Sequence, residues 1–301
     1  MALSELKFIK LRIIFRAEES GRLPPFLGST VRGILGHSMR NLVCVAPNVK
    51  CHLCEYVTDC DYATYFNPPG SFAGSIKPYV IHVPIRDKVN WHKGDLLSFD
   101  LTFFGKSTTA IDYYMAGILG MEKYGWGAQR LKFSLQQVVN ISDQSLVWSG
   151  GETWWHHMKA FSINDEGRFT NSVLLRFTSP TRIVVKQNLV KQLEFKHIIR
   201  SIMTRIKLLL HGYAGVVLEW DEEKLLTDAQ AIKTVEEAWE FVDFKRYSRT
   251  YNRQLRLPSI MGYARYEGDI TPFTPLLEIG QLLQIGKNTT HGFGHYDLYY
   301  G

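Results

Sequence analysis

The strongest constraint on the fold is a pattern that occurs twice, in which a helix is followed by a Gly-x-Gly loop and then by a strand. In the first half, a predicted helix over about 109–124 leads to Gly125-Trp126-Gly127 and to a strand over 131–135 in which apolar and polar residues alternate. In the second half, a predicted helix over about 273–284 leads to Gly292-Phe293-Gly294 and to the last strand of the chain. This is the ending of a split βαβ unit, so the pattern predicts two such units.

The segments before these endings complete the two units. The first half is predicted as strand, helix, strand, strand, helix, strand, with strands over 6–16, 79–84 and 96–104 and a helix whose apolar side carries Val31, Ile34, Leu35, Met39 and Leu42. A strand over 173–177 and a long helix over 195–210 begin the second half in the same order. We therefore expect an α+β protein of two tandem ferredoxin-like (RRM-like) domains, residues 1–145 and 146–301, with a small Cys-rich insertion over about 44–66. A chance similarity of the two endings is the alternative.

The length of the chain agrees with two folded domains, and its net charge indicates which class of partner it binds. The chain has 301 residues, and about 150 residues per domain is typical. A net charge of +6 and a pI near 9.0 favour a polyanionic partner over an acidic protein. The most apolar stretch, 202–217, is interrupted by Arg205, Lys207 and His211, which argues against a membrane span. Because the N-terminus alternates apolar and charged residues, it does not resemble a signal peptide, and we expect a cytoplasmic protein.

All four cysteines fall within one short window, as Cys44, Cys51, Cys54 and Cys60. Four thiolates at this spacing can enclose a tetrahedral zinc ion, with Cys51 and Cys54 forming the tight turn. Such a closed site leaves no position for water, so the predicted zinc is structural and stabilises the insertion. An iron–sulfur cluster, which also takes four thiolates, transient disulfides and unligated thiols are the alternatives.

Two basic segments are candidates for contact with nucleic acid. The stretch 245–265 carries six Lys and Arg residues, contains no Asp or Glu, and is interleaved with tyrosines, a mixture that suits unpaired RNA. An acidic segment precedes it, so pairing of the two within the fold is the alternative. The glycine-rich run 286–294, with Lys287 and His291, can adopt positive φ and can present backbone N–H groups to a phosphate, or it can be a tight helix-to-strand connection.

His37 is the leading candidate for acid–base chemistry. It lies on the first predicted helix opposite the apolar side, with Gly33, Arg40 and Asn41 around it. Imidazole titrates near neutral pH and can take a proton from a ribose hydroxyl. A solvated surface histidine without a catalytic role is the alternative.

Taken together, these motifs resemble the CRISPR-associated precursor-RNA-processing endoribonucleases of the RAMP superfamily, in a branch with a Cys-rich insertion. The resemblance covers nearly the whole chain. It rests on the order of several motifs: Leu27-Gly28-Ser29-Thr30-Val31-Arg32-Gly33-Ile34-Leu35-Gly36-His37, the Cys51/Cys54 pair with Cys60-Asp61-Tyr62, Phe104-Gly105, Gly125-Trp126-Gly127-Ala128-Gln129-Arg130, Ser179-Pro180-Thr181-Arg182, Arg246-Tyr247-Ser248-Arg249, Ile285-Gly286-Lys287 and Gly292-Phe293-Gly294. One departure concerns the start of the final loop. In the family this loop often begins with Gly-x-Gly, whereas here Gln284 occupies the first of those positions, before Ile285 and Gly286.

The resemblance implies tandem ferredoxin-like folds and cleavage of CRISPR repeat RNA without metal, by attack of a 2′-OH that leaves a 2′,3′-cyclic phosphate and a 5′-OH. It places the catalytic role on His37, with His52 as the second choice, and Arg40 or Lys50 as the group that stabilises the phosphate charge. The candidate RNA-binding residues are Arg182, Arg246, Arg249, Arg253, Gly286, Lys287, His291, Gly292 and Gly294.

The resemblance also names the expected partners. These are repeat RNA and its processed product, with subunits of a CRISPR effector complex and a second copy of the chain as further candidates. A non-catalytic RAMP protein that binds guide RNA within an effector complex is the closest alternative function. A zinc-stabilised interaction module without an RNA role is a third.

Overall fold

The computed structural model describes residues 2–70, 76–85, 88–164, 166–248 and 253–301, with side chains left undescribed at 2 and 246–248. It divides into two compact units, which are described separately: an N-terminal unit, Leu6–Ser162, and a C-terminal unit, Ile163–Gly301 with Met1–Glu5. The division between Ser162 and Ile163 falls within the boundary region expected from the sequence, 142–171, but after the predicted limit of the first domain at residue 145. Two strands beyond it, β7 (Ser145–Ser149) and β8 (Glu152–Thr153), continue the sheet of the N-terminal unit.

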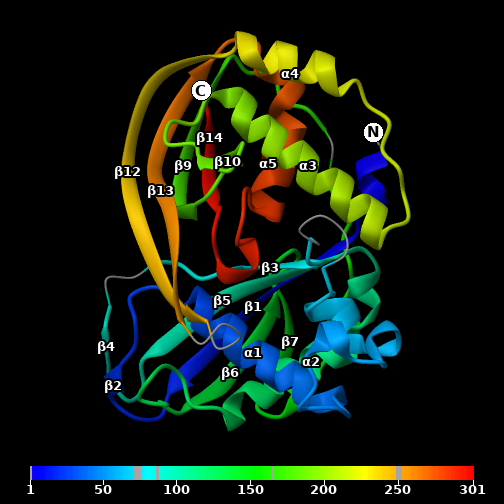
Figure 1. Cartoon of the computed structure of the whole chain (residues 1–301), viewed down its shortest axis with the longest axis vertical. Helices are drawn as coiled ribbons and strands as arrows, with labels where there is room; N and C mark the ends of the chain where they lie inside the picture. The colour runs from blue at the N-terminus through cyan, green and yellow to red at the C-terminus, as the bar shows by residue number, and fades with distance from the viewer. Residues whose placement is uncertain (1, 71–75, 86–87, 165, 249–252) are drawn as a thin grey trace. The chain divides into compact units, whose positions relative to one another are not determined.

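The N-terminal unit is built on an antiparallel sheet with the order β3-β5-β1-β6-β7-β8 (Figure 1). Its first four strands follow the predicted order of a ferredoxin-like unit, with the first strand between the third and fourth. Their bounds are β1 (Phe8–Ala17), β3 (Tyr79–His82), β5 (Leu96–Phe104) and β6 (Phe133–Asn140), and a separate ladder joins β2 (Gly21–Arg22) to β4 (Asn90–Trp91). Alternation sets the faces of β1, because Leu11 and Ile13 are fully buried while Arg12 is exposed.

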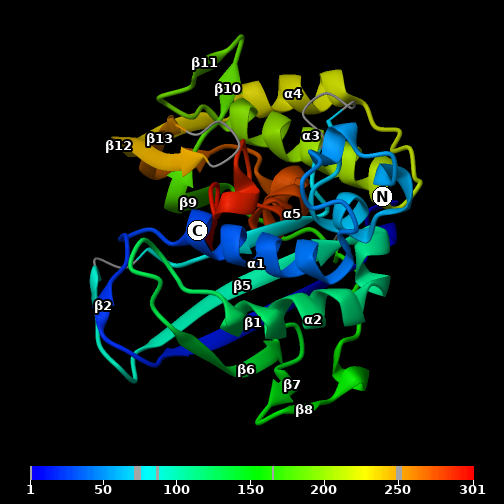
Figure 2. The same ribbon diagram turned by 60° about the horizontal axis from the view of Figure 1, so that its bottom comes forward.

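Two helices, α1 (Gly28–Val43) and α2 (Ile111–Gly120), lie side by side over one face of this sheet (Figure 2). Val31, Leu35 and Met39 recur at every fourth position of α1 and are fully buried. The helices approach closely because α2 has a glycine at the contact, where a Cβ atom on Gly117 would lie 2.5 Å from Cγ of Met39. Leu42, predicted to lie on the same apolar side of α1, is instead 48% exposed.

The C-terminal unit repeats the topology with the sheet order β12-β13-β9-β14. The elements that match the first unit are β9 (Ser172–Thr181), α3 (Phe195–Tyr213), β12 (Lys233–Ser248), β13 (Arg253–Glu267), α5 (Thr274–Leu283) and β14 (Tyr296–Tyr300). Additional elements are α4 (Glu222–Ala231), which packs on α3, and the small ladder of β10 (Val184–Val185) with β11 (Asn188–Leu189). The prediction of two tandem ferredoxin-like units is confirmed.

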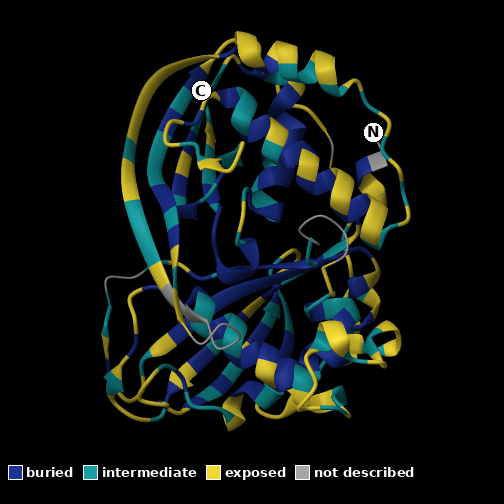
Figure 3. Ribbon diagram, viewed as in Figure 1, coloured by how far each residue is buried: buried dark blue, intermediate teal, exposed yellow. Residues whose placement is uncertain are grey.

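Each unit has an apolar interior of its own. In α3 the predicted stripe is buried, including Ile198, Ile202 and Ile206, and Figure 3 shows buried and exposed residues alternating around this helix. The corresponding interior of the N-terminal unit is lined by the inward side chains of its strands and of α1 and α2. Within the part of the chain that the structure describes, no helix combines the length and the apolar character needed to cross a membrane.

The loop between α5 and β14 closes the C-terminal unit by very close backbone contacts. Gly294 has φ +80°, and a Cβ atom there would lie 1.9 Å from the carbonyl oxygen of Ile285. At Gly286, with φ +77°, a Cβ atom would lie 2.5 Å from the carbonyl oxygen of Arg182. The N–H of Ile285 donates to Gly294 O at 2.9 Å, and the N–H of Gly294 donates to Pro180 O at 3.0 Å. Only glycine fits these two positions.

We predict that Gly294→Ala lowers the free energy of unfolding by about 3 kcal/mol, because the new methyl group forces the backbone of Ile285 to move. Gly212→Ala is the matched control in the same unit. It lies near the end of α3, where a Cβ atom meets nothing within 4 Å. This substitution is expected to raise stability by up to about 1 kcal/mol through helix propensity. Chemical denaturation of both variants tests the contrast, and equal stabilities would contradict the close contacts.

Candidate functional site

The outward face of α1 presents a small polar cluster around His37. His37 is exposed, although its neighbours Gly36 and Ser38 are buried. Its ring stacks beside the ring of Tyr124, with 6.3 Å between the centroids and 30° between the planes. One turn further along α1, Asn41 Nδ2 donates a hydrogen bond of 2.8 Å to the hydroxyl of Tyr124. His37 and Asn41, one turn apart on α1, thus both contact Tyr124.

Open space adjoins His37 on the other side. Gly33 lies one turn before His37, and a Cβ atom placed on it would meet no atom within 4 Å. A substrate can therefore come close to the helix backbone beside the imidazole. The predicted position of His37, on a polar face flanked by glycine, is confirmed by this geometry.

Tyr124 is a site residue that the sequence reasoning missed. It follows the short helix Met121–Lys123 at the end of α2 and directly precedes the Gly125-Trp126-Gly127 turn. The N–H of Trp126 donates to Leu131 O at 2.8 Å, and the N–H of Leu131 donates to Trp126 O at 3.0 Å. This closed turn fixes the position of Tyr124. The sequence feature that could have indicated Tyr124 is the Gly125-Trp126-Gly127 turn, because a tight turn holds the residue before it in a defined position.

Arg40 does not lie in the His37 cluster as the sequence suggested. Its Nη2 donates hydrogen bonds to the backbone oxygens of Pro47 at 3.0 Å and Val49 at 3.2 Å, both in the Cys-rich insertion. This arrangement argues against the predicted role for Arg40 at a reacting phosphate. Lys50 and His52 are exposed and belong to the insertion, where residues Cys51–Leu53 form a short helix.

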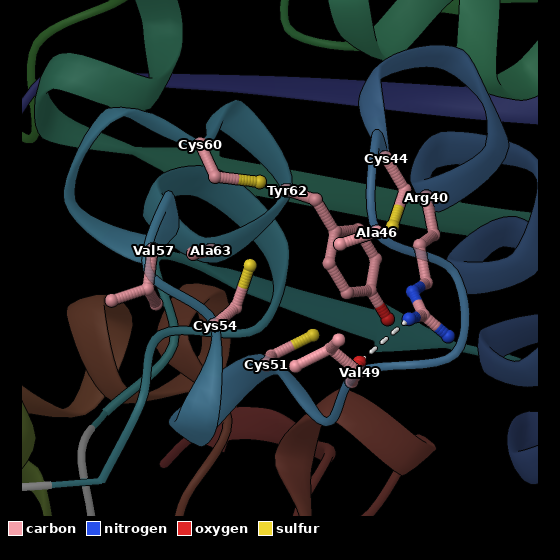
Figure 4. Close-up of a pocket in the computed structure, with 10 residues that line it drawn as sticks. All are labelled: Arg40, Cys44, Ala46, Val49, Cys51, Cys54, Val57, Cys60, Tyr62 and Ala63. Atoms are coloured by element: carbon pink, nitrogen blue, oxygen red, sulfur yellow. Dashed lines mark hydrogen bonds between the residues drawn. The ribbon is translucent and has the colours of Figure 1, made fainter.

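The four cysteines line a single small cavity of about 20 Å³ beside the end of α1. Figure 4 shows their sulfur atoms turned toward the space between them, together with the ring of Tyr62 and the side chain of Arg40. All four thiols are free and half-buried. Burial raises the pKa of the Cys51 thiol, and the positive charge of Arg40 acts in the opposite direction. In the side-chain positions seen here, the described residues contain no group of three or more His, Cys, Asp or Glu arranged to hold a metal ion.

The basic stretch predicted to contact RNA lies in the long β12–β13 hairpin, which also contains part of the acidic segment. Arg256 Nε donates to Asp243 at 2.8 Å, and Arg265 Nε donates to Glu236 at 3.2 Å. Pairing within the fold, the alternative weighed above, therefore holds for these two arginines. Arg253 is exposed at the start of β13. The side chain of Arg246 and the whole of Arg249 lie outside the described residues.

The glycine-rich run is more enclosed than expected. The N–H of Gly286 donates to the Ser201 hydroxyl at 2.9 Å, and the N–H of Gly292 donates to Thr289 O at 3.0 Å. The N–H of Gly294 is used in the loop as well, so the tight helix-to-strand connection, the alternative weighed above, describes these three glycines. Gly292, Gly294 and His291 are buried, and Gln284 is buried with φ +55°.

Two basic residues of the predicted set come together at this loop. The N–H of Lys287 donates to the carbonyl oxygen of Arg182 at 2.8 Å. The side chain of Lys287 is exposed, whereas Arg182 is half-buried. Lys287 is therefore the residue of the loop that can contact a polyanion.

Comparison with solved structures shows the fold. The chain superposes on a Cas6 product complex with a TM-score of 0.60 and 14% identity, covering 97% of this chain and 99% of that one. Cas6 from Thermus thermophilus gives a TM-score of 0.59 and 11% identity, covering 98% and 99% of the two chains. A partial Cas6-RT-Cas1–Cas2 complex gives 0.64 and 14% identity, and there this chain is covered completely but spans only 47% of the longer chain.

Sequence comparisons divide the chain in the same way as the structure does. An uncharacterized protein of Archaeoglobus fulgidus is 25% identical over 307 aligned positions, covering 98% of each chain. Residues 6–160 match a family of N-terminal domains designated AF_1859, and residues 175–296 match the family of the CRISPR-associated endoribonuclease Cas6. The chain therefore belongs to the family with the AF_1859 N-terminal domain, its residues 175–296 are similar to the CRISPR-associated endoribonuclease Cas6, and its fold is that of the solved Cas6 structures.

Proposed function

We propose that this protein cleaves CRISPR repeat RNA within the precursor transcript, without a metal ion, and that His37 is its general acid–base residue. The observation that carries the proposal is the exposed imidazole on α1, held beside Tyr124 and adjoining the open space at Gly33. Such a site can receive a flexible strand at the helix surface and bring a ribose hydroxyl to the imidazole.

The proposed reaction is an internal transfer of the phosphodiester. A base removes the proton of the 2′-OH, and the 2′ oxygen forms a bond to the adjacent phosphorus. The bond from phosphorus to the 5′ oxygen breaks, and that oxygen takes up a proton. The products are a 2′,3′-cyclic phosphate and a 5′-OH. Imidazole can carry out either proton transfer near neutral pH.

Tyr124 is proposed to assist the reaction through its hydroxyl group. This hydroxyl accepts the hydrogen bond of Asn41 at 2.8 Å, and a phenol that accepts one hydrogen bond still has its own hydrogen to donate. Donation toward a phosphate oxygen next to His37 would stabilise the negative charge that accumulates in the transition state. Tyr124 is thus proposed for the electrostatic role that the sequence had assigned to Arg40 or Lys50.

Substrate binding is proposed to use the basic side chains of the C-terminal unit. Lys287 is exposed at the glycine-rich loop, and Arg253 is exposed on the β12–β13 hairpin. Neutralising phosphates with such side chains releases counterions, so RNA binding should weaken steeply as salt is added.

The first prediction from this proposed function concerns His37. In excess EDTA, the parent protein should cut its repeat RNA once and leave a 2′,3′-cyclic phosphate, whereas His37→Ala should be slower by a factor of about 10² to 10⁴. His92→Ala changes another exposed histidine of the same unit and should keep the parental rate. Single-turnover cleavage with mapping of the ends measures this. Loss of cutting in EDTA would contradict metal independence, and cutting that survives in His37→Ala would transfer the role to another residue, with His52 tested next.

A second prediction separates the ring of Tyr124 from its hydroxyl. Tyr124→Phe keeps the ring beside His37 and should slow cleavage about tenfold, the scale of one lost hydrogen bond, with RNA affinity unchanged. Tyr56→Phe, at a tyrosine that is 51% exposed in the insertion, is the control and should be neutral. Parental cleavage by Tyr124→Phe would leave Tyr124 with only a packing role.

The third prediction compares two lysines of the C-terminal unit. Lys287→Ala should reduce the slope of log affinity for RNA against log salt by about one. Lys207 is also exposed, but its Nζ is paired with Glu222 at 2.6 Å, so Lys207→Ala should change the slope by much less. Titrations at several salt concentrations test this. Equal slopes for the parent and Lys287→Ala would exclude the contact, and tight binding without any cutting by the parent would favour a guide-RNA-binding protein.

A further inference from the structure

Between its first and last cysteine, the Cys-rich insertion has no apolar core; its buried residues, Ala63 and Phe66, come after Cys60. Residues 44–60 are all described, and none of them is buried. Its larger apolar side chains face solvent, with Val45 75% exposed and Leu53 70% exposed. Its two short helices, Cys51–Leu53 and Val57–Asp59, contribute no buried residue. Segments of this size usually depend on a disulfide or a metal ion for stability.

What the insertion has instead is a cavity lined by all of its thiols. Cys44 follows the last residue of α1, Cys51 begins a short helix, Cys54 ends it, and Cys60 precedes the helix Tyr62–Phe66. The four thiols therefore come from the end of α1, from both ends of one short helix and from just before the helix Tyr62–Phe66, and all four line one cavity of about 20 Å³. A space of that size holds about one water-sized particle, which suits a single ion.

Arg40 lines the same cavity and supplies the positive charge that such a site needs. Four thiolates outweigh the two positive charges of a zinc ion, so the filled site would be anionic. Arg40 is held in place by its hydrogen bonds to Pro47 O and Val49 O. Guanidinium groups stay protonated at all physiological pH values, which makes arginine a dependable counter-charge.

We propose that Cys44, Cys51, Cys54 and Cys60 together bind one zinc ion, and that the ion fixes the insertion to the C-terminal end of α1. Binding requires the four side chains to rotate into the cavity until their sulfur atoms reach a tetrahedral arrangement, with Zn–S distances of about 2.3 Å. With four protein ligands the ion has no open position, so its role is structural and independent of the cleavage proposed above.

The link to α1 follows from contacts already formed. The N–H of Cys44 donates to Arg40 O at 2.9 Å and so continues the last turn of the helix. At the other end of the insertion, Phe66 packs against α1 so closely that a Cβ atom on Gly36 would lie 2.7 Å from its ring. A zinc ion that joins Cys44 to Cys60 would close this loop on the helix that carries His37.

Metal analysis of the purified, full-length protein tests the site. We expect about one zinc per chain, released by a thiol-specific mercurial, and a stoichiometry near zero for Cys51→Ser and Cys54→Ser. Val45→Ser, an exposed position in the same insertion, should keep its zinc. Iron with inorganic sulfide, a disulfide found by mass spectrometry, or four freely titrating thiols without metal in the parent would each overturn the proposal. These parent measurements do not depend on whether a variant folds.

Hydrogen exchange tests the link to the helix and does not depend on RNA cleavage. After zinc is removed with the mercurial, amide exchange should become faster in the insertion and over the last turn of α1, residues 40–43. Exchange in α3 should remain unchanged, because that helix belongs to the other unit. Zinc loss without faster exchange in α1 would refute the structural role of the ion.

Discussion

The burial of one face of α1 determines which of its residues can meet a substrate. Val31, Leu35 and Met39 are fully buried, and the contact of Met39 with Gly117 of α2 prevents the helix from turning about its axis. With that face fixed, Gly33, His37 and Asn41 must share another face, because they are also spaced four residues apart. The apolar spacing that folds the helix therefore also positions its imidazole.

The two Gly-x-Gly loops show how one topology serves two purposes. In the N-terminal unit the glycine turn after α2 holds Tyr124 against α1, so the loop completes the His37 cluster. In the C-terminal unit the backbone N–H groups of the equivalent loop donate within the loop, to the end of β9 and to Ser201 of α3, and the loop exposes Lys287 instead. The same helix, Gly-x-Gly loop and strand motif thus positions the ring of Tyr124 in one unit and exposes the side chain of Lys287 in the other.

Periodicity in the sequence was sufficient to predict the architecture. Alternation along β1 and the apolar stripe of α3 appear in the structure as predicted, and so does that of α1 apart from Leu42, because burial dictates these patterns directly. The β12–β13 hairpin was harder to predict, since its charged residues hide the alternation. Cross-strand pairs such as Arg265 with Glu236 stabilise it, and these are visible only once the register is known. The first unit extends past its predicted limit at residue 145 because β7 and β8 continue its sheet after a tight turn.

The candidate site was only partly predictable, for a related reason. His37 could be placed from helical spacing alone, but Tyr124 lies 87 positions away and reaches it only through the packing of α1 on α2. Arg40 illustrates the opposite case. Its position three residues after His37 suggested a shared role, yet its guanidinium donates to two carbonyl oxygens of the insertion. Both bonds come from one nitrogen, Nη2, whose two N–H groups lie in the fixed plane of the guanidinium. The choice of arginine at this position is therefore explained by the insertion rather than by the reaction.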